Sequence, residues 1–137
     1  MRSAVSVSPV WGNSVRERIR AVPLFADLGD AELDLLAEHA SEFGAPAGQA
    51  LIERGRPGSG LFVLEEGTAT VEAPEGTRQL GPGDVFGERA LLDADGERTA
   101  RVRALTEVRC LAIPRPDVEQ LIADHPAFGD RLRQLSD

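Results

Sequence analysis

The sequence FGERALLDADGERTARVRA, residues 86–104, stands apart from the rest of the chain. It follows Gly81-Pro-Gly-Asp84, a sequence that favours a tight turn. Residues 88–92 favour about one turn of helix, whose first backbone amides lack partners within the helix and can bind an anion. Residues 93–96 form a turn that leads back to the next strand. This order of elements predicts a backbone cradle for an anion.

Charged side chains accompany the predicted cradle. Glu88 stands at its mouth and is an acceptor suited to a pair of hydroxyl groups. The turn returns Arg98 close to the same mouth, and Thr99 adds a hydroxyl and an amide. Together they suit a ligand with both a phosphate and a sugar hydroxyl. The alternative is a structural salt bridge between Glu88 and Arg98 in a degenerate pocket.

The cradle belongs to a glycine-rich region of short β-favouring runs between turn signals, from about residue 43 to residue 113. The predicted strands are residues 50–52, 60–64, 69–71, 77–80, 98–105 and 108–113. Short strands at such spacing are typical of antiparallel sheets that close into a barrel, here a jelly roll of the double-stranded β-helix type.

Helical patterns flank this region. Ser14 and Glu17 have capping-box spacing at the start of a short helix that ends before Pro23. A second helix begins at Asp30, and its acidic residues are interpreted as a solvated face: Asp30, Glu32, Asp34, Glu38 and Glu42. Two more helices are predicted within residues 115–136, the last of them starting at Pro126.

The predicted fold class is therefore α+β, an antiparallel β-barrel flanked by N-terminal and C-terminal helices. Residues 1–13 are expected to be a flexible leader, and residues 14–137 a single domain. A chain of 137 residues is long enough for one ordinary core.

Composition narrows the classes of function. All 15 basic residues are arginine, so lysine-based chemistry is excluded, and a net charge of −8 argues against binding to nucleic acid. The single cysteine, Cys110, cannot form an internal disulfide, which favours a reducing compartment. No apolar run is long enough to cross a bilayer. We expect a soluble cytoplasmic domain without a membrane partner.

Residues 86–104 resemble the phosphate-binding cassette of cyclic nucleotide-binding domains, found in the catabolite activator protein, protein kinase A regulatory subunits and cyclic nucleotide-gated channels. The matching residues are Phe86-Gly87-Glu88, Ala90-Leu91-Leu92 and residues 98–104. The ten-residue step from Glu88 to Arg98 resembles the catabolite activator type. The resemblance covers about residues 20–135. It implies a stand-alone regulatory module, not an enzyme, that binds cAMP in preference to cGMP and signals to an effector protein by repositioning its end helices.

The resemblance also implies a role for each site residue. Glu88 would bind the ribose 2′-hydroxyl, Arg98 the cyclic phosphate, and Thr99 the phosphate and the base edge. The phosphate oxygens would accept hydrogen bonds from the backbone amides of Gly87, Ala90 and Leu91. The apolar walls near base and sugar would be Val71, Leu80 and Phe86.

Two features depart from the family pattern. Arg89 stands where the family usually has leucine or isoleucine. The last helix, from about Pro126 to Asp137, is expected to end before the position where relatives place a lid over the base.

These departures keep a second class of function open, a protein-interaction domain of the same fold whose pocket binds no nucleotide. A barrel enzyme of the cupin kind is a third class, and it needs a cluster of histidines on strands. The two histidines here, His39 and His125, are interpreted as a helix-face residue and a turn residue. No metal site, cofactor or catalytic residue is predicted.

Overall fold

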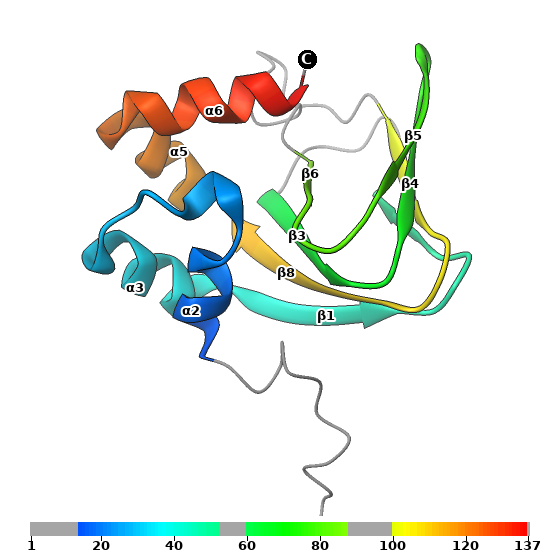
Figure 1. Cartoon of the computed structure of the whole chain (residues 1–137), viewed down its shortest axis with the longest axis horizontal. Coiled ribbons are helices and arrows are strands. Elements are labelled where there is room, and N and C mark those ends of the chain that lie inside the picture. Colours follow the sequence, from blue (N-terminus) through cyan, green and yellow to red (C-terminus); the bar gives the residue numbers. More distant parts are fainter. Residues whose placement is uncertain (1–13, 53–59, 88–99, 137) are drawn as a thin grey trace, which may run out of the picture.

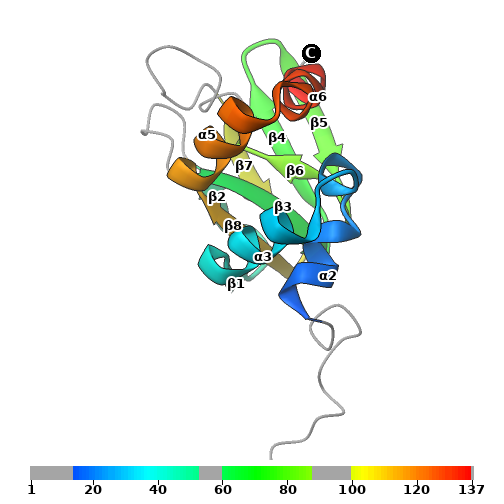
Figure 2. The same cartoon turned by 90° about the vertical axis from the view of Figure 1, so that its left-hand side faces the viewer.

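Two antiparallel sheets face each other, and helices cover the outer side of one of them (Figures 1 and 2). The computed structural model describes residues 14–52, 60–87 and 100–136, and within these ranges eight strands form two four-stranded sheets. The first sheet has the order β1 (Ser41–Ala45), β8 (Val108–Pro114), β3 (Gly60–Glu66) and β6 (Val85–Phe86). The second has the order β2 (Ala50–Ile52), β7 (Arg101–Ala104), β4 (Ala69–Ala73) and β5 (Gly76–Leu80). The predicted α+β fold with a jelly-roll barrel is confirmed.

The described helices lie at the two ends of the sequence. They are α2 (Val15–Arg20), the 3-10 helix η2 (Pro23–Phe25), α3 (Asp30–His39), α5 (Arg115–Asp124) and α6 (Pro126–Ser136). The predicted cap of the first helix is present, because the Ser14 hydroxyl accepts a hydrogen bond from the Glu17 amide at 3.2 Å. Helices α3 and α6 begin at Asp30 and Pro126, as the sequence pattern predicts.

Some boundaries differ from those predicted. The strands begin at Ser41, two residues before the expected start of the barrel, so Glu42 lies in β1 and not on the acidic helix face. Strand β3 continues to Glu66, because its pairing with β8 continues to that residue. The expected leader, the predicted helix at residues 88–92 and the first residues of the predicted strand 98–105 lie outside the described residues.

The first sheet is a wall shared by two cores. Leu61 and Val63 of β3 pack with the helices in one apolar cluster. Phe62 and Leu64, the residues between and after them, pack inside the barrel with the second sheet. Side chains alternate between the faces of a strand, and a sheet covered on both faces is apolar at nearly every position. This explains the unbroken apolar run 61–64.

A buried ion network fastens α2 to the first sheet. The guanidinium of Arg18 donates to both carboxylate oxygens of Glu65 on β3, from Nη2 to Oε1 at 2.7 Å and from Nε to Oε2 at 3.1 Å, and also to Glu42 on β1. Arg18 and Glu65 are both buried. Burial alone would lower the pKa of Arg18, but the hydrogen bonds with Glu65 and Glu42 outweigh it and raise the pKa, so the guanidinium stays charged.

The turn between β5 and β6 provides a matched test of backbone strain. The Asp84 amide donates to the Gly81 carbonyl at 3.1 Å, and Gly83 has φ +93°. This is a type II turn with Pro82 at its second position.

A Cβ added at either Gly81 or Gly83 would meet nothing within 4 Å, but only Gly83 is at positive φ. Gly83→Ala should lower the free energy of unfolding by about 1–2 kcal/mol in urea titrations, whereas Gly81→Ala should leave it unchanged or slightly raised. Equal effects would contradict this assignment of the turn.

Cys110 lies on β8 and is fully buried in the barrel core. Burial raises the pKa of its thiol to about 12, and the negative charge of Glu65 adds to the rise. In the unfolded chain the thiol ionises near its ordinary value of about 8.5. The folded state therefore retains the proton longer, and the free energy of unfolding should fall as pH rises from about 9 toward 12.

Few other groups can lower the free energy of unfolding at alkaline pH, because the chain has no tyrosine and its basic residues are all arginine. The expected slope from the thiol is about 1.4 kcal/mol per pH unit, measured by urea unfolding between pH 9.5 and 11. The Cys110→Ala variant should lose this slope. If it loses stability with pH as steeply as the wild type, another group is responsible.

Candidate ligand-binding site

The predicted site residues fall into two sets. Four lie among the described residues, namely Val71, Leu80, Phe86 and Gly87. The other five lie outside the described residues, as Arg89 does, and their roles stay predictions: Glu88, Ala90, Leu91, Arg98 and Thr99.

The three predicted apolar wall residues come together inside the barrel. Leu80 and Phe86 are buried members of one cluster, and Val71, which is partly exposed, packs against it. The ring of Phe86 stacks on Phe62 at 5.4 Å between centroids, and Phe62 meets Phe43 edge-on at 5.9 Å. The barrel therefore has an apolar, partly aromatic interior where strands of both sheets meet.

The described chain approaches residues 88–99 from one sheet and leaves them in the other. Strand β6, which ends at Phe86, pairs with β3 of the first sheet. Strand β7, which begins at Arg101, pairs with β2 and β4 of the second sheet. Gly87 follows β6 directly with φ +90°, a conformation that favours glycine. The last described residue before the predicted helix of the cradle thus has a backbone conformation that favours glycine.

The strand register adds Arg78 to this face of the barrel, a residue that the sequence analysis did not select. Val71 of β4 lies opposite Arg78 of β5 and Val102 of β7. Paired residues project from the same face of a sheet, and Val71 and Val102 both face the barrel core. The backbone of Arg78 therefore directs its exposed side chain toward the inner side of the sheet. Only the register of the β4–β5 hairpin could have pointed to it.

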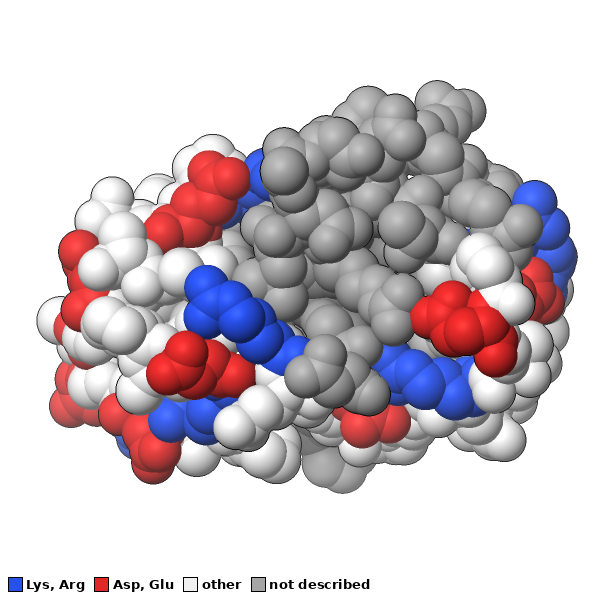
Figure 3. Space-filling view, turned by 90° about the horizontal axis from the view of Figure 1, so that it is seen from above, with Lys and Arg blue, Asp and Glu red and all other residues white. Residues whose placement is uncertain are grey.

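Arg103 of β7 and Arg109 of β8 project from the outer faces of their sheets, and both are paired with carboxylates. Arg103 Nε lies 3.6 Å from Glu72, and its Nη1 donates to the Gly48 carbonyl at 3.0 Å. Arg109 lies 3.7 Å from Glu66. Figure 3 shows described acidic and basic side chains interspersed on the face seen from above.

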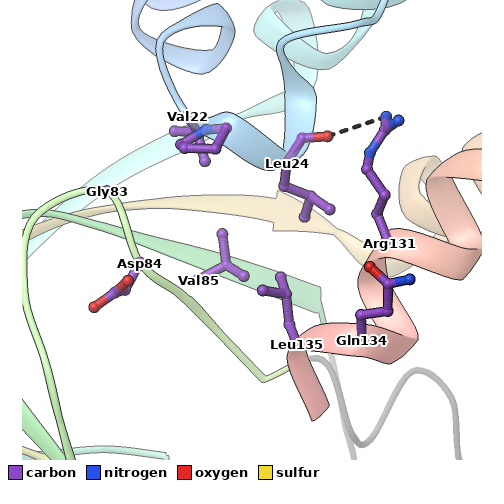
Figure 4. A pocket seen from close by; sticks show the side chains of 9 residues that line it. Val22, Leu24, Gly83, Asp84, Val85, Arg131, Gln134 and Leu135 are labelled. Atoms are coloured by element: carbon purple, nitrogen blue, oxygen red, sulfur yellow. Dashed lines mark hydrogen bonds between the residues drawn. The ribbon is translucent and has the colours of Figure 1, made fainter. Parts of the chain in front are cut away.

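A groove of about 290 Å³ lies outside the barrel interior, between η2, the end of the β5–β6 turn and α6 (Figure 4). Val22 and Leu24 line one side, Val85 the second and Leu135 the third. Arg131 of α6 donates to the Leu24 carbonyl at 3.4 Å. Helix α6 also holds η2 through Phe128, whose ring stacks on Phe25 at 5.6 Å. The last helix therefore contacts η2, and its Leu135 lines the groove together with Val85, the residue before Phe86.

Both histidines lie in the helical layer and not on barrel strands. His39 is the last residue of α3, and His125 caps the end of α5. In the described ranges, no group of three or more His, Cys, Asp or Glu side chains is placed to hold a metal ion. None of the described helices is both long and apolar enough to cross a membrane.

The sequence of residues 44–125, more than half of the chain, matches the family model described as the cyclic nucleotide-binding domain. The chain belongs to the cyclic nucleotide-binding domain family. The described part of this cyclic nucleotide-binding domain thus contains the barrel and the two segments that flank the predicted cassette.

Relatives and solved structures agree with this family. A cyclic nucleotide-gated potassium channel of Rhizobium etli is 35% identical over 118 residues, which are 86% of this chain and 33% of the channel. The chain thus spans about one third of that relative's length. The crystal structure of a putative cyclic nucleotide-binding protein from Geobacter metallireducens has a TM-score of 0.75 and 25% identity over 88% of this chain and 90% of its own.

A second similar structure carries a different description. It is the regulatory subunit of a cAMP-independent protein kinase A from Trypanosoma brucei, with a TM-score of 0.74 and 25% identity. The match covers 88% of this chain and 47% of that one.

Proposed function

We propose that this domain is a non-catalytic regulatory module that binds a cyclic nucleotide, cAMP in preference to cGMP, through residues 86–104. Family membership carries the proposal, together with the apolar interior formed by Val71, Leu80 and Phe86 next to Gly87. The preference for cAMP rests on the resemblance of the Glu88-to-Arg98 spacing to the catabolite activator cassette. A cytoplasmic location and an effector protein as partner belong to the same proposal.

Local electrostatics support an anionic ligand in spite of the acidic chain. A net charge of −8 repels anions at long range, so a phosphate needs local donors. Arg98 and the backbone amides of residues 87–91 would provide them at the cassette. Arg78 adds a cation on the inner side of the second sheet. A ligand with a flat aromatic base and a single phosphate charge would place the apolar face of its base against the wall and its phosphate at the cradle.

Signalling would proceed through the end helices. Residues of η2, of the turn before β6 and of α6 line the same groove, and β6 leads directly into the cassette. A cassette that moves on binding phosphate would displace β6 and the turn, and α6 would then repack. Such a ligand acts by favouring one of two helix arrangements through its differential affinity for them.

The second candidate is a protein-interaction domain of the same fold that binds no nucleotide. A similar structure described as the regulatory subunit of a cAMP-independent protein kinase A keeps this candidate open, because its TM-score of 0.74 is close to the 0.75 of the putative cyclic nucleotide-binding protein. Arg89, at a position where the family usually has an apolar residue, favours it as well.

Calorimetric titration of the whole chain with cAMP, and then with cGMP, tests the proposal. Saturable binding at micromolar or lower concentration, tighter for cAMP, is expected. Tighter binding of cGMP would overturn the base preference alone. No binding and no rise in Tm up to millimolar concentration of either nucleotide would overturn the proposal and favour the interaction domain.

A further inference from the structure

The chain has two histidines, and both pair with a carboxylate across the same helix–helix contact. His39 at the end of α3 meets Asp117 in the first turn of α5, with 2.6 Å between Nδ1 and Oδ2. His125 at the end of α5 meets Glu32 in the first turn of α3, with 3.3 Å between Nε2 and Oε2. The two pairs are reciprocal, since each helix gives a histidine from its C-terminal end and a carboxylate from its N-terminal end.

The spacing places one histidine–carboxylate pair at each end of the contact between α3 and α5. Seven residues separate Glu32 from His39 and eight separate Asp117 from His125, which are about 10 and 12 Å of helix. Antiparallel helices of matched length therefore place both pairs in register. Between them, Leu33 of α3 and Leu121 of α5 are buried in the same apolar cluster.

The four groups lie at helix ends whose partial charges are opposite in sign to theirs when they are ionised. A helix has partial positive charge at its N-terminus and partial negative charge at its C-terminus. Both carboxylates lie in first turns, and both imidazoles lie at C-terminal ends. Within the described residues, the ion-pair partners of the two imidazoles are three carboxylates: Asp117, Glu32 and Glu38, whose Oε1 is 3.5 Å from His39 Nε2.

We propose that these two pairs form a proton-operated clamp, which holds α3 on α5 more firmly when the imidazoles are protonated. A protonated imidazole makes a charge-assisted hydrogen bond with a carboxylate, whereas a neutral imidazole makes a weaker one. Imidazole is the side chain that ordinarily changes charge between pH 5 and 8. The stabilisation that the two pairs give to the α3–α5 contact is therefore complete at the acidic side of this pH range, and it is lost as the pH rises. Because α3 precedes the barrel and α5 follows it, the clamp sets how independently the two helical ends move. It does not depend on the proposed function.

Thermal unfolding of the whole chain at pH 6.0 and pH 7.5 tests the clamp, because these values lie on either side of the ordinary pKa of histidine and above that of a carboxyl group. The wild type should gain about 2–5 °C more in Tm at the lower pH than the His39→Gln/His125→Gln variant gains. The Asp117→Asn/Glu32→Gln variant keeps both histidines and removes their partners, and it should lose the same gain. A control on α5 is Arg115→Gln/Glu119→Gln, an ion pair at 2.8 Å whose charges do not change in this range.

The control variant should keep the wild-type difference between the two pH values. If either clamp variant also keeps it in full, the clamp is overturned. If the histidine variant fails to fold, the carboxylate variant decides alone, since its histidines can still titrate but have no charged partner across the contact.

Discussion

Arg98→Leu is expected to weaken binding of the cyclic nucleotide by about ten-fold to more than a hundred-fold. A hydrogen bond between a charged guanidinium and a phosphate contributes roughly 1.5–3 kcal/mol, and each 1.4 kcal/mol is about a factor of ten in Kd. Leucine keeps the bulk of the side-chain stem but removes the charge and all donors. Calorimetric titration of both proteins with the nucleotide that the wild type binds measures the ratio directly.

A matched control separates this local contact from the general effect of one lost positive charge. Arg133 lies on α6, its side chain is 58% exposed, and its guanidinium pairs with Asp130 on its own helix at 3.2 Å. Arg133→Leu removes the same charge from the chain and should change Kd less than two-fold. If wild type binds and Arg98→Leu binds equally well, Arg98 does not contact the phosphate, although the binding function itself would stand.

Arg18→Met should lower the free energy of unfolding by about 3–5 kcal/mol, the largest effect on stability that we expect from one substitution. Methionine fills much of the same volume but leaves the buried carboxylate of Glu65 without its partner. Removing one member of a buried ion pair costs about this much, because the remaining charge is neither solvated nor compensated. Urea unfolding followed by circular dichroism measures the loss.

The neighbouring Arg16 is the natural comparison, since it lies on the same helix and its guanidinium is 3.3 Å from Asp34 at the surface. Arg16→Met should cost about 1 kcal/mol or less, as for other exposed ion pairs. The double variant Arg18→Met/Glu65→Leu should recover much of the lost stability, because it removes both charges. A loss in Arg18→Met no larger than in Arg16→Met would mean that the buried pair contributes no more than a surface one.

Local patterns predicted most of the elements correctly. The Ser14–Glu17 spacing marks a real helix cap, and Asp30 and Pro126 start helices where predicted. Each of these signals involves residues within one or two helical turns of each other in the sequence. They can therefore be interpreted without knowing which elements pack together. The wall residues Val71, Leu80 and Phe86 were implied by the family resemblance; they lie in or against one apolar cluster, and their contact with a ligand stays a prediction.

Long-range partnerships escaped the sequence analysis for a physical reason. Arg18 and Glu65 are 47 residues apart, and each resembles an ordinary surface charge until α2 packs on β3. Strand β1 has polar and small residues, such as Ser41, Glu42 and Gly44, and becomes a strand by pairing with β8. The two histidines were correctly placed at helix and turn positions, but their reciprocal carboxylates become neighbours only when α3 meets α5.

The wall shared by the two cores has a consequence for cooperativity. Because successive residues of β3 belong alternately to the helical core and to the barrel core, neither core can melt while the other keeps its strand intact. The loss of structure of the helical ends is therefore coupled to that of the barrel. The domain should unfold in a single all-or-none transition between folded and unfolded states.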